Sequence, residues 1–392
     1  IYYYSYQVAG LYIHVPFCSQ RCTYCDFYFV TTNKSHVGFV EALCREIEIQ
    51  GHKYGHLEPI ETIYFGGGTP SQLSLENLER IIQSVNGHFT TTSVLETTFE
   101  INPEDATLDY LRGLRGLNID RLSIGIQSFF DQDLKFMNRV HDAKQAKQVI
   151  GDVRKAGFDN FSLDLIFGVP NQPEEYWSAN LDIAQGFDTP HISTYNLTIE
   201  EATPLANLVK RGLVVPVDDD ESMNRFSFTM DYLQAKGYEH YEISSFAKPG
   251  HRAVHNHKYW SHANYIGVGP SAHSFWWNGL PAERWSNIRN LRLYEAKLMQ
   301  HEIPIDEKEF LSLDMLADEH IMLRLRTIEG LNLNELEERY GVDLFSERLQ
   351  ALADLEEGGF IHPIKNQIVR LTDLGKTVCN TVTATLLPAD VS

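Results

Sequence analysis

Strand-like and helix-like stretches alternate along the first half of the chain, and this alternation limits the fold more than any other feature. Six runs of strand character recur at wide intervals: GLYIHV, TIYFGG, VLETTFEIN, RLSIGIQSF, NFSLDLIFG and HISTYNLTI. Helical stretches lie between them. Ser74 is placed to cap LENLERIIQSV, and another helix is expected from Ala143 to Ala156, ending at Gly157.

Such a series of strands and helices predicts a parallel sheet, because strands separated by helices are joined by right-handed crossovers. Six units fall short of the eight of a closed (β/α)8 barrel. We therefore expect an α/β fold, a partial (β/α)6 TIM-like barrel over residues 10–200. Residues 1–9 are expected to be a disordered or artificial start.

The second half of the chain is less regular. Residues 201–305 are expected to be a connecting region, in which the acidic run Asp218, Asp219, Asp220 and Glu221 begins a solvated helix. Residues 306–385 have a helical pattern that ends in GGFIHPIKNQIVRLT, an alternating stretch typical of a hairpin. Helices followed by a hairpin predict a mostly helical, winged-helix-like C-terminal domain.

Composition and charge exclude several classes of function. The apolar fraction of 43% is ordinary for a globular protein. A net charge of −20 disfavours nucleic acid, whose binding depends on clustered Lys and Arg. No apolar run is long enough to span a bilayer, and IYYYSYQV does not resemble a signal peptide. We expect a cytoplasmic protein that contacts membrane proteins only transiently.

Three of the five cysteines lie in the segment CSQRCTYC, as Cys18, Cys22 and Cys25. Thiolates with this spacing can hold three corners of a 4Fe-4S cluster and leave the fourth iron open. An open iron can bind the amino and carboxylate groups of S-adenosyl-L-methionine (SAM), and an electron from the cluster can break a carbon–sulfur bond to give a radical. The alternatives are a zinc site completed by a residue such as His14, or buried thiols without a ligand.

Polar and glycine residues at the ends of the later strands indicate one shared ligand site. Gly66, Gly67 and Gly68 would let the backbone approach a ligand closely. Side chains that could bond its polar groups are Thr69, Glu100, Gln127, Arg139 and Asp164. Each of these alone could also be ordinary polarity at the rim of a barrel. We assign no functional role to the other two cysteines, Cys44 and Cys379.

The segments YIHVPFCSQRCTYCDF, GGGTP, FEINPE, GIQSF, MNRVH and LDLIFGVP resemble the radical-SAM family of oxygen-independent coproporphyrinogen III oxidases and their relatives, the HemW haem chaperones. The resemblance covers nearly the whole chain. It implies a 4Fe-4S cluster, and it implies a second SAM molecule in the oxidases. By motif position, the implied SAM contacts are Tyr12, Gly68, Thr69, Glu100, Gln127, Arg139 and Asp164.

Two features separate the two branches of that family. The oxidases have a further cysteine two positions after the third cluster cysteine, where this chain has Phe27. The chaperone branch has an HNxxYW motif, found here as His255, Asn256, Tyr259 and Trp260. A neutral imidazole is a common haem ligand, so the resemblance favours His255 as the haem ligand. Candidate second ligands are His251, His257, His262 and His273.

The same residues also have a plain structural interpretation, as surface histidines and core aromatics packed against the barrel. Three functions therefore remain open. The resemblance implies first a chaperone that binds haem and delivers it to apo-haemoproteins such as respiratory enzymes, with a monomer-to-dimer change. The second is an oxidase that decarboxylates coproporphyrinogen III in haem biosynthesis, and the third is a radical-SAM enzyme with another substrate.

Overall fold

Six parallel strands form the centre of the structure. The structure is a computed structural model, and it describes residues 8–31 and 36–387. The strands are β1 (Ala9–Val15), β2 (Ile60–Gly67), β3 (Glu96–Ile101), β4 (Arg121–Gln127), β5 (Asn160–Phe167) and β6 (His191–Asn196). Each pairs with the next along the chain. The predicted partial (β/α)6 barrel is confirmed, although β1 already begins at buried Ala9. Residues 1–7 of the expected start lie outside the described residues.

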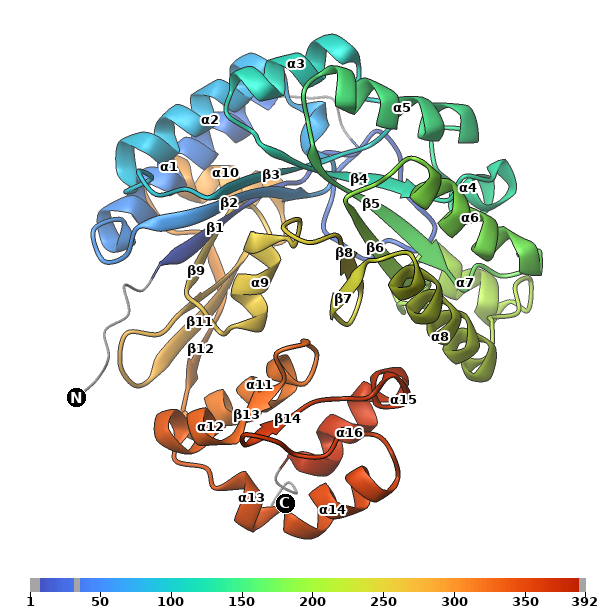
Figure 1. Cartoon of the computed structure of the whole chain (residues 1–392). Coiled ribbons are helices and arrows are strands. Elements are labelled where there is room, and N and C mark those ends of the chain that lie inside the picture. Colours follow the sequence, from blue (N-terminus) through green and yellow to red (C-terminus); the bar gives the residue numbers. More distant parts are fainter. Residues whose placement is uncertain (1–7, 32–35, 388–392) are drawn as a thin grey trace.

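Helices on the convex side of the sheet connect these strands (Figure 1). They are α1 (His36–Tyr54), η1 (Pro70–Gln72, a short 3-10 helix), α2 (Leu75–His88), α3 (Leu108–Gly116), α4 (Asp131–Phe136), α5 (Ala143–Lys155) and α6 (Glu174–Gly186). Ser74 caps α2 by accepting a hydrogen bond from the Asn77 amide. Gly157 follows α5 with a φ of 88°, as expected for a glycine that ends a helix.

The connecting region is more regular than its sequence predicts, because its strands extend both ends of the sheet, and its last strand runs past the expected end at residue 305 to Leu311. Its elements are α7 (Pro204–Lys210), α8 (Asp219–Ala235), β7 (Glu239–Glu242), β8 (Ser245–Ala247), α9 (Val254–Trp260), β9 (Tyr265–Val268), β10 (His273–Trp276), β11 (Ala282–Asn287), α10 (Leu291–Met299) and β12 (Ile305–Leu311). Among the described residues the sheet has 12 strands, in the order β12-β11-β10-β9-β1-β2-β3-β4-β5-β6-β8-β7. Asp218 caps α8, so the acidic run begins a helix as predicted.

The C-terminal part is mostly helical and faces the concave side of the sheet (Figure 1). It contains α11 (Leu313–Arg324), β13 (Leu331–Asn332), α12 (Leu333–Tyr340), α13 (Leu344–Glu347), α14 (Leu349–Glu357), β14 (Ile368–Val369), α15 (Asp373–Thr377) and α16 (Cys379–Leu386). Antiparallel bridges join Ile361 to Leu371 and Lys365 to Ile368, which confirms the expected hairpin.

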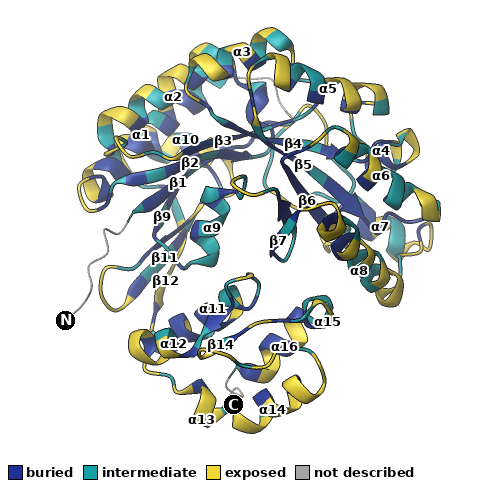
Figure 2. Cartoon of the chain, viewed as in Figure 1, coloured by how far each residue is buried: buried dark blue, intermediate teal, exposed yellow. Residues whose placement is uncertain are grey.

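Burial follows the two faces of the sheet and the inner faces of the helices (Figure 2). One hydrophobic cluster lies mainly between the sheet and the helices that cover its convex side, and a second lies mainly in the C-terminal part. Each of the two parts therefore has its own core. Across 8–31 and 36–387, no helix combines the length and apolar character needed to cross a membrane.

Candidate cofactor-binding site

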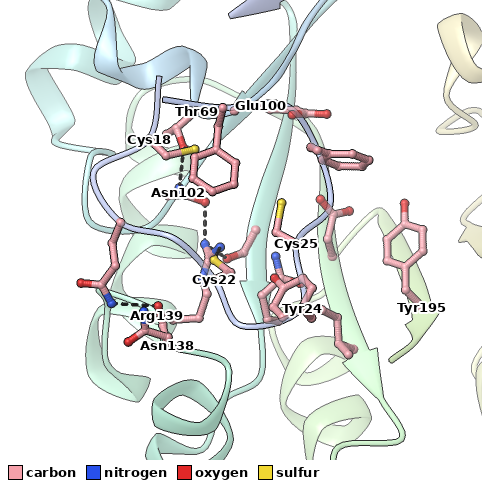
Figure 3. A pocket seen from close by; sticks show the side chains of 18 of the residues that line it. Cys18, Cys22, Tyr24, Cys25, Thr69, Glu100, Asn102, Asn138, Arg139 and Tyr195 are labelled. Atoms are coloured by element: carbon pink, nitrogen blue, oxygen red, sulfur yellow. Dashed lines mark hydrogen bonds between the residues drawn. The ribbon is translucent and has the colours of Figure 1, made fainter. Parts of the chain in front are cut away.

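A cavity of about 660 Å³ opens where the parallel strands reach their carboxyl ends. It gathers polar residues from the loop after β1 and from β2, β3, β4 and β5 (Figure 3). The predicted site residues that line it are Cys18, Cys22, Cys25, Gly68, Thr69, Glu100, Gln127, Arg139 and Asp164. The structure thus brings these residues together, as the strand-end pattern predicts.

The three thiols belong to a loop that is closed at its base. The Cys18 amide donates to the Val30 carbonyl at 3.0 Å, and the Val30 amide donates to the Pro16 carbonyl at 2.7 Å. Thr69 Oγ1 donates to Cys18 Sγ and an Arg139 Nη1–H donates to Cys22 Sγ, both at 3.4 Å. Donors of this kind stabilise thiolates, which are the form that binds metal.

The three cysteine thiols fit the binding of a 4Fe-4S cluster. Each of its thiolates binds a different iron, so the sulfurs need not converge on one point. Among the described residues, no group of three His, Cys, Asp or Glu side chains has the arrangement for a single metal ion. His14, the candidate fourth zinc ligand, has its Nε2 at 3.0 Å from the Tyr28 carbonyl and its Nδ1 at 3.2 Å from the Tyr12 hydroxyl.

Gly68 lets the loop after β2 pack directly against the chain that leads into the cysteines. Its amide donates to the Val15 carbonyl at 2.8 Å. A Cβ at this position would lie 2.8 Å from the Phe17 carbonyl oxygen and 2.9 Å from that of Val15. Such distances exclude any side chain, so the glycine is required for the two loops to meet.

Two carboxyl groups, one on β3 and one on β5, face the cavity. Glu100 accepts hydrogen bonds from the Tyr64 hydroxyl at 2.7 Å and the Gly67 amide at 3.2 Å. Burial raises the pKa of Glu100 to about 7, against the opposing effect of these two donors. Asp164 accepts from Ser123 at 2.8 Å, while its buried Oδ1 has no hydrogen-bond partner among the described residues. A buried acceptor in this position fits a polar ligand such as SAM.

Arg139 is held by a residue that sequence reasoning missed. Its Nη2 donates to Asn102 Oδ1 at 2.6 Å, and Asn102 Nδ2 donates to Thr69 Oγ1 at 3.2 Å (Figure 3). The available signal was the position of Asn102 in FEINPE, directly after a strand. Gln127, at the end of β4, has a φ of 63°, an uncommon value for a residue other than glycine that often occurs at functional sites.

Two of the predicted contacts do not line the cavity. Tyr12 stacks on Tyr64 with ring centroids 6.0 Å apart. His255 is 1% exposed, and its ring nitrogens bond to Thr62 Oγ1 at 2.8 Å and to the Tyr259 hydroxyl at 2.9 Å. Neither nitrogen is open to iron in this arrangement. Haem ligation by His255 therefore stays a prediction that requires one of these two hydrogen bonds to break, because a single ring nitrogen binds the iron.

Comparison with known proteins gives agreeing matches to family models, to sequence relatives and to a solved structure. Residues 12–183 match the Radical SAM superfamily, and residues 311–378 match the HemN C-terminal domain. The heme chaperone HemW of Bacillus subtilis is 32% identical over 378 residues, covering 96% of this chain and 98% of the relative. The heme chaperone HemW of Escherichia coli is 36% identical over 266 residues, covering 67% of this chain and 69% of the relative.

A solved structure matches over nearly the full length. It is the coproporphyrinogen III oxidase HemN of Escherichia coli, a radical SAM enzyme, with a TM-score of 0.83. The alignment covers 98% of this chain and 91% of that one at 20% identity, so it supports the fold. Together with the full-length sequence relatives, these matches show that the chain belongs to the HemW family of radical SAM proteins.

Proposed function

We propose that the protein is a haem chaperone that holds a 4Fe-4S cluster on Cys18, Cys22 and Cys25, and that binds SAM in the adjoining cavity. Its cargo is haem, which it delivers to apo-haemoproteins such as respiratory enzymes. The relatives named heme chaperone HemW support this function. The single observation that carries the cofactor part is the convergence of three thiols and two partly buried carboxyl groups on one cavity. We place the protein in the cytoplasm, where thiols stay reduced.

The residues of the cavity have distinct roles in this proposal. The cluster supplies an open iron and a low-potential electron when it is bound. Arg139 and Thr69 donate hydrogen bonds to the thiolates and so stabilise their negative charge. Glu100 and Asp164 accept hydrogen bonds from hydroxyl or amino groups of SAM, and Gly68 allows the backbone to approach its methionine end. Gln127 bonds a remaining polar group.

Phe27 favours the chaperone over the oxidase. It stands where the oxidase pattern has a fourth cysteine, it lines the cavity, and its side chain is 65% exposed. An aromatic ring cannot supply a thiol. An exposed apolar ring at the mouth of a cavity instead suits contact with the flat apolar face of a porphyrin. His255 serves as the proposed axial ligand only after one of its ring nitrogens is freed from Thr62 or Tyr259.

The test compares the two functions in one anaerobic preparation. After the cluster is reconstituted, SAM and coproporphyrinogen III are added, and 5'-deoxyadenosine and decarboxylated product are measured. In parallel, haem is titrated and the Soret band is followed. The proposal expects a saturable Soret band without porphyrinogen turnover. Turnover without a Soret band would contradict it and would support the oxidase.

The haem ligand is tested in the same titration. If His255 binds the iron, His255→Ala shifts or removes the Soret band. The control His52→Ala changes an exposed histidine of α1 that is not a candidate ligand, and it is expected to leave the band unchanged. An unchanged band in His255→Ala would reject His255 as the ligand and leave haem binding to another residue.

A further inference from the structure

His255 is fixed inside the barrel by both its side chain and its backbone. Besides the two bonds of its ring to Thr62 and Tyr259, its backbone amide donates to Glu96 Oε1 at 2.9 Å. The amide of Val254 donates to the other oxygen of the same carboxylate at 3.0 Å. Helix α9 lies on the concave side of β1, β2 and β3 (Figure 1). The start of α9 is therefore anchored to the strands that form the cavity.

The ring of His255 stacks on a tyrosine of β2. The ring centroids of His255 and Tyr64 are 5.0 Å apart, with an angle of 30° between the planes. Thr62 and Tyr64 are two residues apart on one strand, so both side chains point to the same face. Tyr64 also stacks on Tyr12 of β1, with ring centroids 6.0 Å apart. Tyr64 thus contacts two aromatic rings, one of which belongs to α9.

Tyr64 in turn contacts a residue of the cavity. Its hydroxyl donates to Glu100 Oε1 at 2.7 Å. Gly66 leaves room for this bond, because a Cβ there would lie 2.8 Å from Tyr64 Cε1 and 2.9 Å from Glu100 Oε1. Burial keeps the imidazole neutral by lowering the pKa of His255 to about 3, so the ring packs on Tyr64 without a charge. A continuous set of contacts joins α9 to the cavity.

We propose that His255 is a positioning residue of the SAM site, which holds the Tyr64 ring in place so that the Tyr64 hydroxyl orients Glu100 toward bound SAM. The HNxxYW helix then serves the cofactor cavity from within the barrel. This inference rests on the proposed function, because it requires that SAM bind beside Glu100.

The experiment measures SAM affinity by calorimetry on the full chain with its cluster reconstituted, together with the change that SAM causes in the electron paramagnetic resonance spectrum of the reduced cluster. Tyr64→Phe removes only the hydroxyl that orients Glu100, and His255→Ala removes the ring that holds Tyr64. Each substitution is expected to weaken SAM binding about tenfold, the effect of losing one hydrogen bond to a charged group. The double variant is expected to lose little more than either single one, because both act through the same contact.

Two further variants separate positioning from general destabilisation. His320→Ala removes another buried histidine that bonds a tyrosine hydroxyl, at 3.1 Å from Tyr340, but lies in the C-terminal part. It is expected to lower thermal stability and leave SAM affinity unchanged. His255→Phe keeps a ring against Tyr64 and is expected to restore most of the affinity lost in His255→Ala, although it leaves two hydroxyl groups without their histidine partner.

Wild-type SAM affinity in either His255→Ala or Tyr64→Phe would overturn the inference, and so would an equal loss in His320→Ala. Should His255→Ala fail to fold, Tyr64→Phe and His255→Phe decide the question. A Soret band lost in His255→Ala with SAM affinity intact would overturn the inference while supporting His255 as the haem ligand. If the unaltered chain with its cluster bound no SAM, the proposed cofactor function would fail together with the inference.

Discussion

Gly68 is the residue whose change tests the cavity most simply, because a methyl group added there would meet backbone oxygens that cannot move aside. Gly68→Ala is expected to cost about 1–3 kcal/mol in the free energy of unfolding, the usual range for overpacking a fixed site, and to weaken SAM binding. Chemical denaturation and calorimetry measure the two effects.

The matched control is Gly87→Ala in α2, where an added Cβ has nothing within 4 Å. There the change should stabilise the helix slightly, since alanine favours helix more than glycine does. Equal denaturation midpoints for Gly68→Ala and Gly87→Ala would contradict the close contact at Gly68.

At the scale of residues, spacing within the chain predicted the cysteine loop, and position at strand ends predicted most of the cavity. Tyr64 and Asn102 were not predicted. Their importance comes from partners far away in the sequence, such as His255 for Tyr64 and Arg139 for Asn102. The burial of His255 was missed for the same reason, because a histidine-rich segment has no pattern that distinguishes an inward-facing histidine from a surface one.

Helix α1 is joined to the extended end of the sheet through one buried carboxyl group. Glu46 accepts hydrogen bonds from the Gly269 amide at 2.7 Å, the Tyr294 hydroxyl at 2.6 Å and the Asn287 side chain at 2.6 Å. Burial nevertheless raises the pKa of Glu46 to about 7. In the unfolded chain this carboxyl loses its proton near its ordinary pKa of about 4.5.

The pH dependence of stability follows from that difference. Between about pH 4.5 and 7 the folded protein holds a proton that the unfolded chain has released, so the free energy of unfolding falls as pH rises. Glu46 accounts for a loss of about 3 kcal/mol over this window. Glu46→Gln should flatten the decline in the free energy of unfolding with rising pH, measured by denaturation at several pH values. The control Glu48→Gln, at an exposed site on the same helix, should not change this decline. An unchanged slope in Glu46→Gln would contradict the raised pKa.

Strands β1 to β6 were predicted because each is an apolar run followed by a helix. Strands β9 to β12 were not, because they are short or exposed and depend on distant partners. Five consecutive residues of β12 are exposed, so the strand has no inward-facing apolar pattern. Strand β9 has four residues and pairs in parallel with β1, more than 250 positions away in the chain. Pairing over such a separation has no local signal.

The contact between the barrel and the C-terminal part contains a cluster of rings. Tyr340 is buried, and its hydroxyl bonds to His320 Nδ1 at 3.1 Å and to His262 Nδ1 at 3.3 Å. Its ring centroid lies 5.5 Å from that of Trp277. Because His262 and Trp277 belong to the connecting region, Tyr340 ties the two parts of the molecule together.

Tyr340→Ala is therefore expected to cost about 3–5 kcal/mol, as for other large aromatic residues removed from a core, and to make the C-terminal part more sensitive to proteolysis. Phe345→Ala changes a ring that is 40% exposed in the same part and should have an effect within about 0.5 kcal/mol. Similar stability of Tyr340→Ala and the unaltered chain would show that the two parts do not depend on this cluster.

At the scale of the whole molecule, the proposed function requires three thiols that hold a 4Fe-4S cluster and leave one iron open for SAM. The most direct measurement is the metal content and the electron paramagnetic resonance spectrum of the anaerobically reconstituted chain, with and without SAM. It compares the unaltered protein with Cys22→Ser and with the control Cys44→Ser. The account predicts about four iron atoms per chain and a spectrum that changes on SAM addition, both lost in Cys22→Ser and kept in Cys44→Ser. Bound zinc in place of iron, or an unchanged cluster in Cys22→Ser, would contradict it.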